Sequence, residues 1–179
     1  MPESAVEDRR EAPDFGRVYE AEAERVYHRL RRLGVADRDL EDKMHDVFVV
    51  VHQKLSEYDP SRPITPWIAG ITVRVAADHF KRAFRKREVM QTDVDERHAG
   101  PDPEAALQTR QEQRLLLSLL DELEPDRRAL VVLHDLEGYE MPEIAELLQV
   151  GVNTLYSRLR MAREQLAKEL RLRQKGGRR

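Results

Sequence analysis

The last third of the chain carries a pattern of apolar residues that predicts two helices separated by a tight turn. From Val152 onward, apolar residues recur at spacings of three and four, which is the buried face of a helix of about five turns. A shorter apolar stripe precedes it, and Gln149 to Gly151 fill the turn between the two. The apolar positions are Ile144, Ala145, Leu147 and Leu148 in the first stripe, and Val152, Leu155, Leu159, Ala162, Leu166 and Leu170 in the second. This pattern is typical of a helix-turn-helix.

The opposite face of the second helix carries side chains that suit contact with DNA. Amide, hydroxyl and guanidinium groups can read base edges, and a helix that is apolar on one face and basic on the other fits a major groove. The residues predicted to contact duplex DNA are Asn153, Thr154, Tyr156, Ser157, Arg158, Arg160, Met161 and Arg163. The pattern therefore predicts a DNA-binding protein.

The charge distribution also favours nucleic acid, although the net charge of the 179 residues is only −3. Basic residues gather between His79 and Arg87 and again between Arg158 and Arg179, with acidic residues between the two stretches. A single basic stretch is usually a solvated helix face, but the second of these adjoins the helix-turn-helix. Two basic patches separated by acidic material predict two contacts with a polyanion.

The composition argues against several other classes of protein. The chain has no cysteine, so it has neither disulfides nor thiolate metal ligands. No run of eighteen apolar residues is present and the N-terminus is polar, so we expect no membrane helix, no signal peptide and a cytoplasmic location. No glycine-rich phosphate loop or nucleophile elbow is found. We therefore expect no enzyme, no catalytic residues, no metal and no cofactor.

The rest of the chain has helical periodicity and no convincing strand. Helices are expected at 15–33, at about 37–55 and from Trp67 into the first basic patch, and the segment SEYDPSRPITP, with three prolines, is expected to be a loop. The fold class is therefore all-α, with two small helical domains joined by a flexible linker. The expected parts are a disordered N-terminus (1–13), a first domain (14–87), an acidic linker (88–111), a second domain (112–172) and a basic tail (173–179).

Taken together, the two halves resemble the extracytoplasmic-function sigma factors of bacterial RNA polymerase, which keep only sigma domains 2 and 4. The resemblance rests on LEDKMHDVFVVVHQKLSEYDPSRPITPWIAGITVRVAADHFKR and on LEPDRRALVVLHDLEGYEMPEIAELLQVGVNTLYSRLRMAREQL. It implies a transcription initiation factor that binds core polymerase, recognises the −35 and −10 promoter elements and assists melting. The implied partners are core polymerase (clamp helices of the largest subunit and flap of the second) and promoter DNA. An anti-sigma factor is compatible with the sequence but not demanded by it.

The resemblance also implies roles for particular residues, with −35 recognition falling to the helix-turn-helix. The residues implied for binding core polymerase are Glu41, Asp42, Asp46, Val47 and Phe48. Those implied for the −10 element and melting are Tyr58, Arg62, Trp67, Arg74, Asp78, Lys81 and Arg82. Melting needs aromatic rings that stack on unpaired bases and a pocket for an extruded base. Trp67 can also be a core residue, and for Tyr58 packing within its own loop is an equal alternative.

The chain departs from the family's pattern in the first domain. Many members have leucine where this chain has Lys43, basic or polar residues at Gly70 and Val73, and asparagine at Arg74. The −10 preference is therefore expected to differ from that of other members.

Two other functions fit parts of the sequence. Asp42, His45, Asp46 and His52 have helical spacing that could bind a divalent ion, but Val47, Phe48 and Val51 claim the buried face, so the acids and histidines are expected to face solvent or a partner. The alternative function is a conventional helix-turn-helix regulator that binds an operator without polymerase. The sensor domains of such regulators are usually α/β, and no such pattern is found in the first half.

Overall fold

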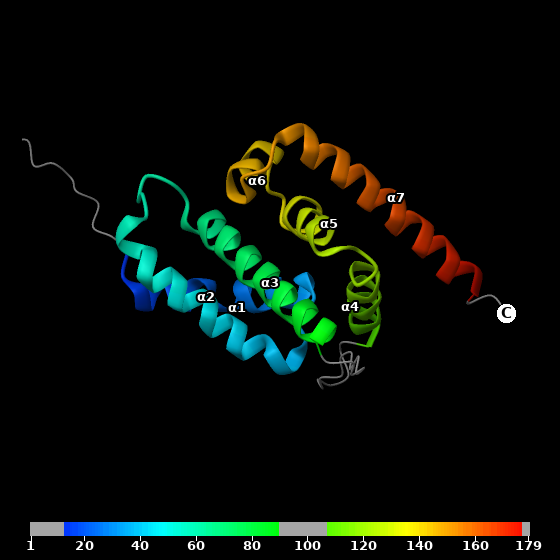
Figure 1. Ribbon diagram of the computed structural model, residues 1–179, viewed down its shortest axis with the longest axis horizontal. Coiled ribbons are helices and arrows are strands. Elements are labelled where there is room, and N and C mark those ends of the chain that lie inside the picture. Colours follow the sequence, from blue (N-terminus) through cyan, green and yellow to red (C-terminus); the bar gives the residue numbers. More distant parts are fainter. Residues whose placement is uncertain (1–12, 90–106, 177–179) are drawn as a thin grey trace, which may run out of the picture.

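The computed structural model describes residues 13–89 and 107–176, and this part of the chain is built of helices with no strand (Figure 1). The first half contains α1 (Phe15–Leu33), α2 (Leu40–Lys54) and α3 (Ile64–Val89), with 3-10 turns at Asp37–Asp39 and Leu55–Glu57. The second half contains α4 (Leu107–Leu120), α5 (Pro125–Leu130), a π-helical segment (Val131–Leu136), α6 (Met141–Leu148) and α7 (Val152–Gly176). The expected all-α fold with a C-terminal helix-turn-helix is confirmed. None of these helices is long and apolar enough to cross a membrane.

Helices α1, α2 and α3 pack against one another through their apolar faces. α1 begins after Asp14, whose carboxylate accepts a hydrogen bond from a backbone N–H of the first turn at 3.0 Å. It ends at Gly34, where a φ of 97° favours glycine. In α2 the helical period turns Val47 and Phe48 into the core and leaves Val49 exposed.

Helices α6 and α7 form the predicted helix-turn-helix. α6 ends at Gln149, which takes the left-handed conformation with φ 56°, and α7 begins at Val152. Leu155, Leu159 and Ala162 of α7 are buried, as the spacing predicted. The turn between α6 and α7 therefore has the length expected from the sequence.

The segment between α5 and α6 contains the π-helical turn. There the N–H of Glu137 bonds to the carbonyl of Val132 at 3.0 Å, which is one residue further back than in an α-helix. Gly138, with φ 77°, then ends the helical run. The chain then passes through Tyr139 and Glu140 into α6.

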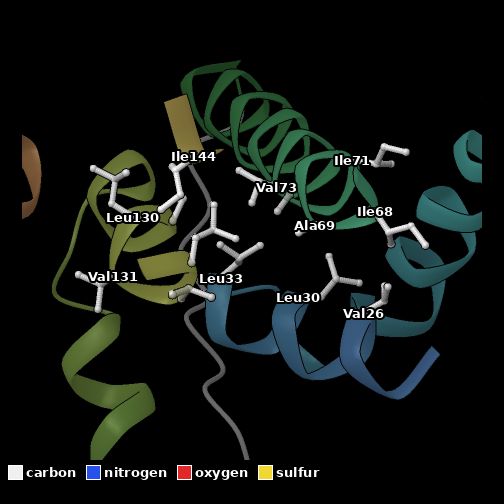
Figure 2. Close-up of a cluster of buried hydrophobic side chains, with 14 of the residues drawn as sticks. Val26, Leu30, Leu33, Ile68, Ala69, Ile71, Val73, Leu130, Val131 and Ile144 are labelled. Atoms are coloured by element: carbon white, nitrogen blue, oxygen red, sulfur yellow. The ribbon is translucent and has the colours of Figure 1, made fainter. Parts of the chain in front are cut away.

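Helices α1 to α3 form a first unit and helices α4 to α7 form a second unit. The two units lie against each other and share one apolar core (Figure 2). Leu33 of α1 and Val73 of α3 lie in this core with Leu130 of α5 and Ile144 of α6, and each is buried. These shared core residues hold the two units side by side, a placement that the sequence did not predict.

The expected domain limits remain a prediction. α4 begins at Leu107, so its first residues fall in the segment expected to be linker, and α7 continues to Gly176, into the expected basic tail. Residues 88 and 89 of that linker belong to α3, its residues 90–106 lie outside the described residues, and so do 1–12 and 177–179.

Candidate nucleic-acid interface

The predicted DNA-reading residues of α7 lie on the side of the helix that faces away from the core. Leu155 and Leu159 are buried on the opposite side. The exposed residues are Asn153, Thr154, Tyr156, Ser157, Arg160, Met161 and Arg163, with Arg158 partly exposed at the edge. The register of α7 is therefore the expected one, and contact with DNA stays a prediction.

The three arginines of this face are each paired with a carboxylate of the same unit. Arg158 lies 3.3 Å from a carboxylate of α5, and Arg160 lies 3.3 Å from Glu164, one turn further along. Nε of Arg163 donates to Asp135 at 3.1 Å, and hydrogen bonding to Asp135 raises the pKa of Arg163. Exposed pairs of this kind contribute about 0–1 kcal/mol. A phosphate or a base can therefore replace the carboxylate with little loss of free energy.

Tyr58 and Trp67, the aromatic residues on either side of the proline-rich loop, are in contact with each other. Their ring centroids lie 5.1 Å apart, with an angle of 45° between the ring planes. The Tyr58 hydroxyl donates to the backbone carbonyl of Arg62, so Tyr58 does pack within its own loop. Burial raises the pKa of Tyr58, and the charge of Asp59 adds to this effect. The loop is thus held in shape by its own side chains.

Four of the residues expected to bind the −10 element line one open cavity of about 640 Å³. These residues are Tyr58, Arg62, Trp67 and Arg74, and the other wall of the cavity is formed by Glu143, Glu146 and Leu147 of α6. The remaining three, Asp78, Lys81 and Arg82, are exposed further along α3, and Asp78 lies 3.9 Å from Lys81. The structure therefore brings the aromatic rings together with two guanidinium groups and leaves the other three residues apart from them.

The acidic residues expected to bind polymerase are exposed on α2. Glu41, Asp42 and Asp46 all face solvent, and Asp46 forms an ion pair with Lys43 of the same helix. Within the described residues, no group of three histidine or acidic side chains could hold a metal ion.

Val47 and Phe48 do not belong to this surface, and their assignment to it was wrong. Val47 is fully buried, and Phe48 is 4% exposed with its ring centroid 4.6 Å from that of Tyr19. The helical period that turns the acids outward turns these two residues into the core. Val49 of the same helix is exposed instead, at 39%.

The sequence analysis also missed a buried ion pair between the two units. Nε of Arg29, a residue only 2% exposed, donates to the two carboxylate oxygens of Glu137 at 2.8 and 3.1 Å. Arg29 also donates to the hydroxyl of Tyr139 at 3.4 Å. Burial raises the pKa of Glu137, and the charge of Arg29 offsets part of this effect. No local spacing in the sequence indicates such a contact.

The family models match both helical units. Residues 18–86 match the family described as sigma-70 region 2, and residues 113–166 match the family described as sigma-70, region 4. The two units with the surfaces described above thus define a sigma-70-type protein that has region 2 followed by region 4.

Individual relatives show which group of sigma-70-type proteins the chain resembles. The chain is 32% identical over 164 residues to the ECF RNA polymerase sigma factor SigE of Mycolicibacterium smegmatis, covering 90% of this chain and 63% of that relative. It is 30% identical over 148 residues to SigM of Mycobacterium tuberculosis, an ECF RNA polymerase sigma factor, covering 82% of this chain and 72% of SigM. The chain belongs to the extracytoplasmic-function (ECF) sigma factors of RNA polymerase. The prediction of a transcription initiation factor is confirmed, and the conventional regulator is not favoured.

A solved structure supports the fold. The sigma factor RpoE of Bartonella quintana, solved in complex with the anti-sigma factor NepR, matches with a TM-score of 0.75 at 17% identity. The match covers 88% of this chain and 97% of RpoE.

Proposed function

We propose that this protein recruits core RNA polymerase to promoters and holds the melted −10 strand in the cavity at the start of α3. The observation that carries the proposal is the placement of the Tyr58 and Trp67 rings beside the guanidinium groups of Arg62 and Arg74. Aromatic faces stack on unpaired bases, and guanidinium groups bind phosphates. This arrangement suits single-stranded DNA, whose unpaired bases are free to stack on aromatic faces.

Duplex recognition belongs to α7 in this proposal. Its exposed face carries Asn153, Ser157 and Arg160 at its centre, with Arg158 and Arg163 toward the edges. Central amide and guanidinium groups suit base edges in the major groove, and arginines at the edges suit phosphates. α7 is therefore assigned to the −35 element.

The exposed acids of α2 are assigned to core polymerase. Glu41, Asp42 and Asp46 are exposed on α2, and the exposed side chain of Val49 follows Asp46 by three residues, so the helix offers charged groups and one apolar side chain to a partner. We assign this face to the clamp helices of the largest subunit and the second unit to the flap of the second subunit. In this proposal the first unit is sigma domain 2, with the limits 14–87 expected from the sequence. The second unit is sigma domain 4, with the limits 112–172.

Sigma factors are not enzymes, and this one is proposed to act by binding alone, in the cytoplasm where core polymerase works. RpoE was solved with an anti-sigma factor, and CnrH, a second structure with the same fold (TM-score 0.64, 24% identity), was solved with the cytosolic domain of CnrY. An anti-sigma factor is therefore included among the proposed partners.

Run-off transcription with purified core polymerase on a library of genomic fragments tests the proposal. We expect a set of discrete transcripts that depends on both the protein and the polymerase. Specific binding of a duplex by the protein alone, without any transcript that depends on it, would instead identify a conventional regulator.

A further inference from the structure

The face of α7 that is assigned to duplex DNA carries two large apolar side chains. Tyr156 is 55% exposed and Met161 is 42% exposed. We propose that these two side chains read the 5-methyl groups of thymines, so that the −35 element of this protein combines thymines with the base that Arg160 contacts. The inference rests on the function proposed above and names the base chemistry that α7 selects.

Packing within the protein does not account for these two side chains. In the described part of the chain, the residues of α7 that form the core or pack against it include neither Tyr156 nor Met161. Those residues are Val152, Leu155, Leu159, Ala162 and Leu166. An apolar side chain gains free energy when a partner removes it from water. Tyr156 and Met161 therefore keep an apolar area available to a partner.

The two apolar side chains lie in one patch with the polar groups of the same face. Residues three or four apart are neighbours on a helix, with about 5–6 Å between their Cβ atoms. Tyr156 is thus a neighbour of Arg160, and Met161 is a neighbour of Ser157, which in turn adjoins Arg160. Successive base pairs are about 3.4 Å apart. The thymines are therefore expected within about two base pairs of the base that Arg160 contacts.

Ion pairs hold two arginines at the edges of this patch. Arg158 lies 3.3 Å from Asp126 of α5, and Nε of Arg163 donates to Asp135 at 3.1 Å. Guanidinium groups at the edges of a reading helix suit the phosphates on either side of the groove. The patch between them, with Tyr156 or Met161 on each side of its centre, then faces the base edges.

The major groove offers such side chains one apolar group, which is the 5-methyl group of thymine. The other groups of the base edges are hydrogen-bond donors and acceptors, and an apolar side chain that covers them removes their water without replacing it, which costs free energy. A methyl group lowers this cost because it has no water to lose. The methyl group of 5-methylcytosine has the same place in the groove, so the recognised chemistry is the 5-methyl group of a pyrimidine.

Deoxyuridine tests the inference, because it pairs as thymidine does and lacks only the 5-methyl group. The holoenzyme, formed with core polymerase, first selects its −35 sequence from promoters that are randomised at this element. Each thymine of the selected duplex is then replaced in turn by uracil. The burial of one methyl group corresponds to about a three- to five-fold change in affinity, so we expect a loss of this size at one or two positions.

Variants of α7 show which side chain reads each methyl group. Met161→Ala should lower the affinity for the thymine duplex by a similar factor and lose the further effect of uracil at its own position. Tyr156→Ala should do the same at another position, whereas Tyr156→Phe should keep the effect because the ring makes the contact. The matched control is Leu115→Ala on α4, at an apolar side chain 40% exposed, which should leave the uracil effect unchanged.

A further series of duplexes separates the methyl group from the rest of thymine. A cytosine paired with guanine at a sensitive position should bind weakly, and 5-methylcytosine at the same position should regain part of the affinity. This recovery would support recognition of the methyl group whichever base carries it. Equal binding of cytosine and 5-methylcytosine would contradict recognition of the methyl group itself.

Two further outcomes would overturn the inference and leave −35 recognition by α7 in place. One is a selected element that contains no thymine or binds equally well with uracil at every position. The other is a uracil effect that persists in full in both Met161→Ala and Tyr156→Ala. If the holoenzyme selects no sequence at −35, the assignment of α7 in the proposed function fails and this inference fails with it. The two failures are thus distinguishable.

Discussion

The guanidinium of Arg128 on α5 lies directly over Gly34, the residue that ends α1. A Cβ atom added to Gly34 would lie 1.7 Å from Nη1 of Arg128, and the same Nη1 donates to the carbonyl of Leu33 at 3.2 Å. The end of a helix in the first unit is thus capped by a side chain of the second. This contact requires a residue without a side chain at position 34.

Gly34→Ala is expected to destabilise the protein by more than the backbone strain alone. The left-handed conformation costs a non-glycine residue about 1–2 kcal/mol, and the collision with Arg128 adds to this. Gly138→Ala is a matched control, since Gly138 also has positive φ but an added Cβ meets nothing within 4 Å. Urea unfolding followed by circular dichroism measures both variants. Equal losses would mean that the Arg128 contact adds nothing to stability.

The buried carboxyl of Glu137 is expected to make stability depend on pH. Burial raises its pKa above the usual value of 4.5, so the folded state holds this proton more tightly than the unfolded chain. The contribution of this proton to the free energy of unfolding is fully present below about pH 4.5. It is lost as the pH rises through the pKa that Glu137 has in the folded protein. Glu137→Gln should remove this contribution to the pH dependence of the free energy of unfolding. The urea midpoint, measured across this range for both proteins, checks the expectation, and parallel curves would contradict it.

Arg160→Ala is expected to weaken binding of the −35 element by about 1–3 kcal/mol if the guanidinium makes a bidentate contact with guanine. Affinity for core polymerase and helicity should not change, because the side chain of Arg160 is 71% exposed and takes no part in the core. The control is Glu164→Ala, which removes the same ion pair but leaves the guanidinium free to bind DNA. Binding of wild-type and mutated −35 duplexes by the holoenzyme measures both variants. An equal loss on all sequences would reduce Arg160 to a phosphate contact.

Reversing the charges of α2 is expected to weaken the complex with core polymerase. Asp42→Lys combined with Asp46→Lys should lower the affinity, with a larger effect at low salt, where exposed charges are least screened. Glu24→Lys provides a charge reversal of the same kind on α1. A titration of labelled core polymerase at two salt concentrations gives the answer. Unchanged affinity after the double reversal would remove α2 from the polymerase-binding surface.

Trp67→Ala is expected to impair promoter opening more than promoter binding. The loss of one stacking surface should lower the open complex by roughly ten-fold to a hundred-fold. A template with a pre-melted bubble at −10 should rescue the variant, while a fully duplex template should not. Circular dichroism must first show that the variant is folded, because Trp67 also packs against the core. Equal loss on both templates would indicate a role in packing or polymerase binding.

The sequence predicted those features that depend on local periodicity. The spacing along α7 placed Leu155 and Leu159 inside and the reader face outside, since a helix has one dominant period. The same periodicity placed Val47 and Phe48 in the core, and the resemblance to the family assigned them to a surface. The periodicity predicted the burial of Val47 and Phe48 correctly, because the side of a helix on which a residue lies follows from its spacing in that helix.

The contacts between the two units could not be predicted from the sequence. Arg29 and Glu137 lie in different halves of the chain, and each has the pattern of a solvated charge. Gly70 and Arg74 were interpreted as a change in −10 preference, but in the structure both contact α6. Pairing between distant helices depends on the shape of the whole molecule, which no short window of residues records.

The π-helical segment Val131–Leu136 leads directly into Glu137, whose carboxylate accepts the hydrogen bonds of Arg29 across the two units. A π-helical turn holds about one residue more than an α-helical turn, so it can take in an extra residue without a break in the helix. Deletion of one residue from this segment is therefore expected to be absorbed by a return to α-helical turns, with little change in the position of Glu137 opposite Arg29.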